Sequence, residues 1–226
     1  MDPKYTYSYF RVSKTEAVLD SARKYRDLRL RALQESPGSF ASTYEIESKF
    51  TNADWADRVT VPDREIFICA ATPIQPDRTQ LDVMEWIGQV TLRGPMSRDE
   101  FTLPVESGQR PPKRDEEEER WQMLSLFTLS EHRGNGLGRN LCREALQYLR
   151  NYRSDPPNIH VRLMVKPENH VTVSLYKRLG FIEAGKATLA EALIANGDGH
   201  CLPKDTSTAK YSDRTGLIMV FDISRP

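Results

Sequence analysis

The chain has 226 residues, of which 32 are Lys or Arg and 32 are Asp or Glu, so its formal net charge is zero. This length allows one substantial hydrophobic core, and we predict a single domain spanning residues 1–226 because no stretch has the composition of a linker. The balanced charge creates no overall field that would gather nucleic acid or an anionic membrane, and neither is expected as a partner.

The cysteines and the first residues exclude further classes. Cys69, Cys142 and Cys201 are widely spaced and include no C-x-x-C pair, so neither a disulfide framework nor a bound metal is expected. The first residues lack a basic region followed by an apolar core, and no apolar run is long enough to cross a bilayer. We therefore expect a cytoplasmic or nucleocytoplasmic protein.

Hydrophobic periodicity predicts a chain of alternating strands and helices. In chain order, the first predicted elements are a strand at 9–12, a helix at 18–32, a second helix that contains Trp55 and ends near Val59, and strands at 65–71 and 85–92. They are followed by a strand at 123–129, a helix at 137–149, a strand at 159–165, a helix from 169 and a strand at 217–221. The strands at 65–71 and 85–92 are expected to form a hairpin around a polar turn at 72–79. The strand at 123–129 is apolar on nearly both faces, which is typical of a central strand covered by helices.

Residues 94–120 are expected to form an exposed, mobile loop. They include several prolines and the acidic run Asp115-Glu116-Glu117-Glu118-Glu119, and such a composition buries too little apolar surface to stay compact. An acidic run is usually a solvated face, and the alternative is a role in attracting a cationic amine.

Three alternate glycines, Gly134, Gly136 and Gly138, connect the strand at 123–129 to the next helix. The first N–H groups of a helix are unpaired and carry a partial positive charge, and glycine lacks the Cβ that would hold a phosphate away. We therefore predict that the glycine loop, residues 133–139, binds a pyrophosphate, with Arg133 and Arg139 adding charge. The alternative is a glycine-rich turn that only starts a helix.

Two other phosphate-binding motifs do not fit the glycine loop. A dinucleotide fingerprint requires Gly or Ala at the position of Arg139, and a Walker loop requires a Gly-Lys-Ser or Gly-Lys-Thr that the chain lacks. The run Arg133-Gly134-Asn135-Gly136-Leu137-Gly138 instead resembles the coenzyme A pyrophosphate loop of the GNAT superfamily of N-acetyltransferases.

A second stretch, Asn169 to Phe181, resembles the N-x-x-A-x-x-L-Y-x-x-x-G-F helix of the same family, with Thr172 where alanine is usual. A weaker similarity covers Tyr25 to Leu33 and Ser36 to Phe40. The resemblance implies an α/β (α+β) fold with a mixed central sheet of about seven strands flanked by helices, and with two splayed central parallel strands. It also implies an enlarged connection, about residues 185–215, within the last hairpin.

The resemblance implies acetyl-CoA as cosubstrate and no metal. The residues expected to contact the cofactor are Phe127, Thr128, Leu129, Arg133, Gly134, Asn135, Gly136, Leu137, Gly138, Arg139, Asn169 and Tyr176. Backbone groups near residues 127–129 would pair with the pantetheine arm, and one N–H would polarise the thioester carbonyl.

Asn169 and Tyr176 are seven residues apart and share a helix face. By resemblance, Asn169 bonds the pantetheine arm and Tyr176 is the catalytic acid that protonates the leaving thiolate. The alternative for Tyr176 is a packed tyrosine with its hydroxyl at the surface.

The proton acceptor is left open. Gln122 and Ser125 stand where many relatives have a carboxylate, so Glu85, Glu131 or a chain of water molecules would serve instead. We interpret the four histidines, His132, His160, His170 and His200, as surface residues and assign none of them to catalysis.

The leading hypothesis is an acyltransferase that moves the acetyl group of acetyl-CoA to a primary amine by direct attack. Long connections favour a small-molecule acceptor, and the nearest alternative is a peptide amine, at a protein N-terminus or a lysine. A non-catalytic acyl-CoA-binding module is a third hypothesis, disfavoured because the glycine loop and Tyr176 are both present. A monomer or a homodimer is expected.

Overall fold

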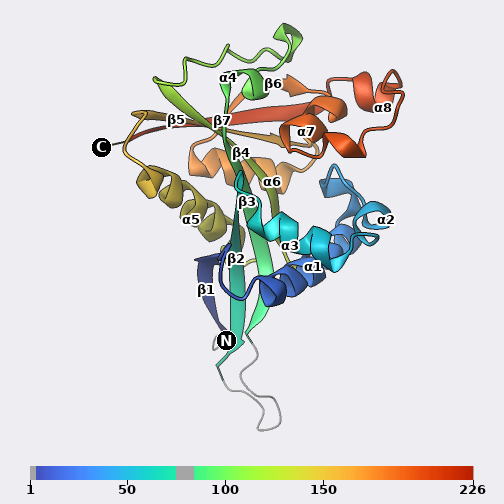
Figure 1. Ribbon diagram of the computed structural model, residues 1–226, viewed down its shortest axis with the longest axis vertical. Helices are drawn as coiled ribbons and strands as arrows, with labels where there is room; N and C mark the ends of the chain where they lie inside the picture. Colours follow the sequence, from blue (N-terminus) through green and yellow to red (C-terminus); the bar gives the residue numbers. More distant parts are fainter. Residues whose placement is uncertain (1–3, 75–83, 226) are drawn as a thin grey trace.

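The computed structural model describes residues 4–74 and 84–225, and most of the predicted polar turn at 72–79 lies outside these residues. The strands form one seven-stranded mixed sheet in the order β1-β2-β3-β4-β5-β7-β6 (Figure 1). Their bounds are β1 (Tyr5–Arg11), β2 (Arg64–Pro73), β3 (Glu85–Met96), β4 (Glu118–Thr128), β5 (Asn158–Val165), β6 (Ile182–Ala187) and β7 (Gly216–Ser224). The sheet implied by the resemblance is confirmed.

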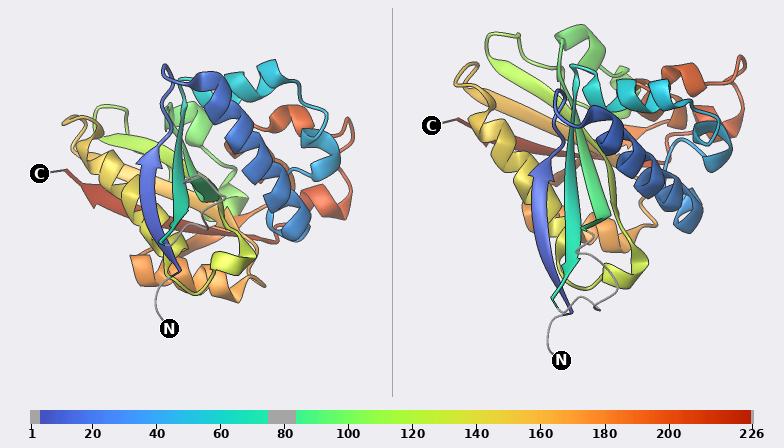
Figure 2. Two further views of the ribbon diagram at one scale, coloured as in Figure 1. Left: turned by 90° about the horizontal axis from the view of Figure 1, so that it is seen from below. Right: turned by 60° about the horizontal axis from the view of Figure 1, so that its bottom comes forward.

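Helices cover both faces of the sheet, with α1 and α3 on one face and α5 on the other (Figure 2). The helix bounds are α1 (Val18–Glu35), α2 (Tyr44–Glu47), α3 (Asn52–Thr60), α4 (Arg98–Phe101), α5 (Leu137–Tyr152), α6 (His170–Leu179), α7 (Leu189–Ala195) and α8 (Ala209–Ser212). The predicted stripe of α5 is buried at Leu137, Leu141, Ala145 and Leu149, because residues four apart share a helix face. None of the helices in the described part of the chain has the length and apolar character to pass through a bilayer.

The two central strands separate partway along their length. β4 and β5 pair in parallel from Glu118 and Asn158 only as far as Gln122 and Arg162. Beyond that pair, β4 continues to Thr128 beside β3, whereas β5 continues to Val165 beside β7. Ser125 has a φ of 59° and lies where the register between β3 and β4 shifts. The left-handed backbone at this bulge accompanies the separation of the two strands, and the expected splay is confirmed.

The segment predicted as an exposed loop at 94–120 is largely built into the fold. β3 extends to Met96 and β4 begins at Glu118, so the connection is shorter than predicted. Within it, the side chain of Phe101 is buried, and the carbonyl of Ser107 lies so close to Gly185 of β6 that a Cβ there would clash. The prediction of exposure was wrong at these positions because the segment packs on the sheet.

The acidic run is also not a uniformly solvated face. Asp115, Glu116 and Glu117 are exposed, but Glu118 and Glu119 are buried at the start of β4. Glu119 accepts hydrogen bonds from Trp121, Arg153 and Arg225. The prediction was wrong for these two residues because guanidinium groups compensate the buried charges, that of Arg110 for Glu118 and those of Arg153 and Arg225 for Glu119.

The last hairpin pairs β6 with β7 in antiparallel fashion, and residues 188–215 connect them. This connection contains α7, which begins with a capping box at Thr188, and α8. Neither β6 nor α7 was predicted from periodicity, and α7 and α8 lie in the enlarged connection that the resemblance implied.

Candidate active site

The glycine loop begins where β4 ends and leads directly into α5. Gly134 and Gly136 have φ values of 87° and 73°, in the left-handed region that favours glycine. Among the described residues, a Cβ at either position would have no atom of another part of the chain within 4 Å, so the loop backbone borders open space. Gly136 is also the N-cap of α5. The structure thus places unpaired N–H groups at an accessible helix start, as an anion site requires.

The other residues of the glycine loop have distinct roles. Leu137 is buried and contributes to the core, whereas Arg139 is exposed. The Arg133 side chain points toward the end of β4, where its Nε donates to the Thr128 carbonyl at 3.0 Å. Asn135 donates to the His132 carbonyl at 3.0 Å and so stiffens the turn. Gly138 lies inside α5, where a Cβ would come within 3.4 Å of Leu175 on α6.

The end of β4 supplies fewer free backbone groups than predicted. The Leu129 N–H donates to the Ile87 carbonyl at 2.8 Å, and the Leu129 carbonyl accepts from the His132 N–H at 3.1 Å. Phe127 lies opposite Gln89 in the same ladder, so its backbone groups also face β3. The backbone groups of Leu129 and Phe127 are therefore engaged within the protein, because alternate residues of a strand face opposite neighbours, and their contact with the cofactor stays a prediction. Of residues 127–129, Thr128 is the one whose backbone N–H and carbonyl face away from β3, toward the side where β5 has separated from β4.

Tyr176 lies in α6, and Asn169 lies directly before the first residue of this helix. Asn169 is the N-cap, and its Oδ1 accepts from the Thr172 N–H at 3.3 Å. Tyr176 is 5 % exposed, and its ring centroid lies 5.5 Å from that of Phe181. Burial raises the pKa of Tyr176 well above 10. This burial argues against the alternative of a tyrosine with its hydroxyl at the surface.

Gln122 and Ser125 occupy the positions at which a carboxylate was sought. Gln122 is fully buried, and its Oε1 accepts from Arg162 Nε at 2.8 Å while its Nε2 donates to Asn196 Oδ1 at 3.3 Å. The Ser125 hydroxyl accepts from Arg29 Nη1 at 3.4 Å. Both groups are poor proton acceptors, because the Gln122 amide is neutral and the Ser125 hydroxyl is hydrogen-bonded to the positively charged guanidinium of Arg29.

A buried ion pair that the sequence reasoning missed lies beside Ser125. Arg29 of α1 donates to Glu47 of α2 through two nitrogens at 2.7 and 3.0 Å. Desolvation raises the pKa of Glu47, but the charge and hydrogen bonds of Arg29 outweigh it and hold that pKa low. A signal was present, because Arg29 falls within the apolar stripe of Tyr25 and Ala32, where an unpaired charge is not tolerated.

The two glutamates proposed as bases are held in ion pairs. Glu85 and Glu131 are exposed, and both contact Arg31 of α1. The pKa of Glu131 is lowered by a hydrogen bond from its own backbone N–H and by Arg31, which outweigh partial desolvation. A lowered pKa makes Glu131 a weaker base.

The prediction that all four histidines are surface residues was wrong for His132 and His160, which are buried. His170 and His200 are exposed, as predicted. The ring of His132 lies 4.9 and 5.9 Å from the rings of Tyr5 and Tyr7, and its Nδ1 is 3.4 Å from the Tyr7 hydroxyl. Through these contacts, the turn after β4 packs against β1.

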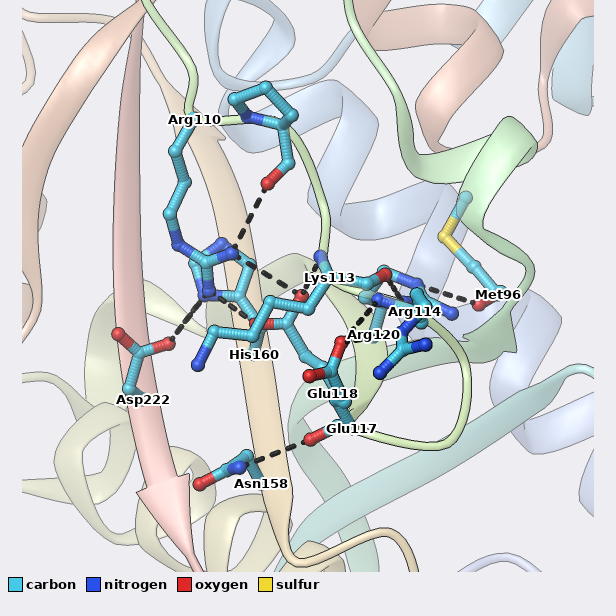
Figure 3. A network of polar contacts seen from close by, with 11 residues as sticks. Met96, Arg110, Lys113, Arg114, Glu117, Glu118, Arg120, Asn158, His160 and Asp222 are labelled. Carbon is cyan, nitrogen blue, oxygen red and sulfur yellow. Dashed lines mark hydrogen bonds and ion pairs between the residues drawn. The ribbon is translucent and has the colours of Figure 1, made fainter.

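His160 belongs to a polar network at the far end of the central strands (Figure 3). Three side chains of this network, those of Glu118, His160 and Asp222, each place one potential metal-ligand atom within 4.8 Å of the other two. Carboxylate oxygens and an imidazole nitrogen are a donor set suited to a metal ion. Arg110, however, contacts Glu118 and lies 3.0 Å from His160 Nδ1 and 3.6 Å from Asp222. In this structure the three residues therefore anchor the connection before β4 through a guanidinium.

An open sheet that splays beside a glycine loop at a helix start is the arrangement that the resemblance to the GNAT superfamily implied. Residues 98–181, which include both motifs, match the profile of the Acetyltransferase (GNAT) family. The match over these residues supports a GNAT superfamily acetyltransferase, and so an acyltransferase. A search of curated proteins found no match to the chain.

Solved structures of several acetyltransferases share the fold. The ribosomal-protein-S5-alanine acetyltransferase of Vibrio fischeri is 11% identical with a TM-score of 0.57, covering 97% of this chain and 96% of that one. Arabidopsis thaliana NAA60 in complex with a bisubstrate analogue is 17% identical with a TM-score of 0.52, covering 97% and 100%. Aminoglycoside 6'-acetyltransferase type Ii is 15% identical with a TM-score of 0.51, covering 97% and 99%. At these identities the likeness concerns the fold.

Proposed function

We propose that the protein transfers the acetyl group of acetyl-CoA to the primary amine of a small molecule by direct attack. The observation that carries the proposal is the convergence of three features beyond the end of β4: the open glycine loop, the separation of β4 from β5, and α6, whose Leu175 lies beside Gly138. The structure of NAA60 has also been solved with acetyl-CoA, which supports the same cosubstrate here.

In the proposed complex, N–H groups of the glycine loop hold the diphosphate, and Arg139 adds positive charge at the exposed side. The pantetheine arm lies in the splay and pairs with the Thr128 N–H, which faces away from β3, because the Thr128 carbonyl already accepts from Arg133. A backbone N–H at this place polarises the thioester carbonyl as negative charge develops on its oxygen.

Tyr176 is the proposed general acid. Leu175, the preceding residue, lies against Gly138 of the glycine loop, so α6 borders the cofactor site. Because burial holds the pKa of Tyr176 well above 10, the hydroxyl keeps its proton at neutral pH. That proton is available to the thiolate of coenzyme A as the carbon–sulfur bond breaks. Asn169, at the start of the same helix, is proposed to bond the pantetheine arm.

The preference for a small acceptor rests on the connections 97–117 and 188–215, which pack over the sheet near the separation of β4 and β5. Among the neighbours, one acetylates aminoglycosides and another a ribosomal protein, according to their names. A peptide amine therefore stays the alternative acceptor. A non-catalytic acyl-CoA-binding module is disfavoured because the glycine loop stays open and Tyr176 lies on the helix beside it.

The test has two stages. Isothermal titration calorimetry with acetyl-CoA and with coenzyme A measures binding, and release of free thiol against a panel of amines and peptides measures transfer. We expect binding followed by turnover with a small amine. Absence of acetyl-CoA binding by the folded protein would refute the proposal, and turnover only on peptides would favour the alternative acceptor.

A further inference from the structure

A β-bulge interrupts the ladder between β3 and β4 where β5 has already left β4. Leu124 lies opposite Thr91 and Phe127 lies opposite Gln89, so three steps along β4 match two steps along β3. The bulge includes Ser125, whose φ of 59° lies in the left-handed region that serine rarely adopts. A backbone conformation of this kind persists only where the surrounding structure fixes it. Ser125 is half-buried, whereas the part of β4 that pairs with β5 is buried, so the bulge borders the splay.

The bulge decides which way the backbone of Thr128 faces. The Leu129 N–H donates to the Ile87 carbonyl at 2.8 Å, and alternate residues of a strand face opposite neighbours, so the Thr128 N–H faces the side that β5 has left. Without the extra residue, the register of the preceding ladder would place Thr128 opposite Ile87, in the position that Leu129 now occupies. The Thr128 N–H would then be bonded to β3. The bulge therefore makes this N–H available to a ligand in the splay.

Two side chains from separate elements contact Ser125. Arg29 of α1 donates from Nη1 to the Ser125 hydroxyl at 3.4 Å, and Gln89 of β3 donates from Nε2 to the Ser125 carbonyl at 3.3 Å. The other two guanidinium nitrogens of Arg29 bind Glu47, and its guanidinium carbon lies 4.6 Å from the centroid of the Phe40 ring. Both donors are buried. A fixed guanidinium and a fixed amide thus contact the bulge at its side chain and at its backbone.

Both donors are costly to bury for the sake of packing alone. Gln89 is fully buried, and among the residues that the structure describes its Oε1 has no hydrogen-bond partner. An apolar side chain of similar volume would fill the same space without an unsatisfied oxygen. Arg29 is a buried cation that is tolerated only because Glu47 is buried beside it. The contacts with Ser125 give these two polar side chains a role that an apolar residue could not fill.

We propose that Arg29 and Gln89 are positioning residues for acetyl transfer, because they fix the bulge at Ser125 and so direct the Thr128 N–H into the splay. The inference rests on the proposed function, in which the pantetheine arm of acetyl-CoA pairs with this N–H. Neither residue contacts the reacting atoms. Both act through the conformation of Ser125, so their effect is on the pantetheine arm and not on the diphosphate, which the glycine loop holds.

The first experiment separates the two halves of coenzyme A. Adenosine 3′-phosphate 5′-diphosphate carries the diphosphate without the pantetheine arm, so its binding reports on the glycine loop alone. Calorimetry measures its Kd and that of coenzyme A for the wild type, Ser125→Ala and Gln89→Met. We expect each variant to weaken the binding of coenzyme A about three-fold or more, the range of one hydrogen bond, and to leave the Kd of the truncated nucleotide unchanged. Equal losses for both ligands, or no loss for coenzyme A, would overturn the inference.

Thr91→Val is the matched control for Gln89→Met. Thr91 follows Gln89 by two residues on β3 and is also buried, and within residues 4–74 and 84–225 its Oγ1 has no hydrogen-bond partner. The substitution changes a buried polar side chain of the same strand without removing a contact to Ser125, so both Kd values should match those of the wild type. If Thr91→Val weakened coenzyme A binding as much as Gln89→Met, the effect would be one of general packing and the inference would fail.

A double-mutant cycle tests whether Arg29 acts through Ser125. Arg29→Lys keeps a positive charge beside Glu47 and removes the Nη1 donor. Because the contact is already lost in Ser125→Ala, adding Arg29→Lys should change the Kd of coenzyme A by no more than about two-fold. Losses that multiply as for independent sites would contradict the inference. Arg23→Lys, at an exposed position of the same helix, is the control and should change neither Kd.

Activity gives a second readout. In thiol release with the best amine, Ser125→Ala and Gln89→Met should lower kcat/KM, whereas Thr91→Val should not, and thermal unfolding checks that each variant is folded. The Ser125 and Gln89 variants decide the inference if Arg29→Lys does not fold. A wild type that bound neither coenzyme A nor the truncated nucleotide would refute the proposed function, whereas a wild type that bound both, with variants that matched it, would overturn the positioning role alone. The two failures are therefore distinguishable.

Discussion

Substitution of Gly136 by alanine tests the proposed diphosphate site most directly. The φ of 73° costs a non-glycine residue about 1–2 kcal/mol, and each kcal/mol lowers the Tm of a chain of this length by about 2–4 °C. In residues 4–74 and 84–225, no atom beyond the chain neighbours lies within 4 Å of the added Cβ, so backbone strain is the expected intramolecular effect. In the complex, however, the methyl group would meet the phosphate. The loss of one charge-assisted hydrogen bond predicts a Kd for acetyl-CoA weakened at least about ten-fold.

Gly108 provides a matched control for this substitution. Its φ is also 73°, and a Cβ there would come no closer than 3.7 Å to another residue, an ordinary contact. Gly108→Ala should therefore lower the Tm by a similar amount and leave the Kd of acetyl-CoA unchanged. Both variants are measured by thermal unfolding and calorimetry. If Gly136→Ala lost stability but bound acetyl-CoA like the wild type, the glycine loop would not hold the diphosphate.

Three further predictions concern Tyr176 and Glu47. Tyr176→Phe should lower kcat about ten-fold or more in thiol release without changing the Kd of acetyl-CoA, and an unchanged kcat would remove Tyr176 from the mechanism. Since the pKa of Tyr176 lies well above 10, the kcat of the wild type should not fall between about pH 8 and 10 through loss of its proton; a fall there that Tyr176→Phe abolishes would contradict this. Glu47→Gln should lower the free energy of urea unfolding by about 3–5 kcal/mol at pH 7, against little change for the exposed Glu144→Gln. Because the pKa of Glu47 is lowered from 4.5, this difference should be complete above pH 4.5 and shrink as the pH falls further.

Local patterns predicted the elements that carry strong periodicity. The stripes of α1 and α5 and the apolar run of β4 appear at the predicted places, because burial of one face imposes a fixed spacing. β6 was missed since its Ile182–Ala187 sequence is mostly exposed and shows no alternation. The splay came from the family resemblance and not from periodicity.

Contacts between distant residues were beyond the reach of the sequence. Glu119 and Arg225 are 106 residues apart, so nothing local indicated that part of the acidic run is buried. The choice between Thr128 and Leu129 depended on the register of β4 against β3, and a shift of one residue reverses which neighbour a backbone group faces. Arg162 alternates with apolar residues, and its burial required knowledge of α4.

The short ladder between β4 and β5 divides the sheet into two half-sheets, β1 to β4 and β5 to β7, that share only the pairing from Glu118 to Gln122 with Asn158 to Arg162. The glycine loop extends from the first half-sheet, whereas Arg162 and the last hairpin belong to the second. Under the proposed function, this division would let the half-sheet with β5 to β7 change in the amine it accepts while the cofactor site on the other half-sheet stays the same.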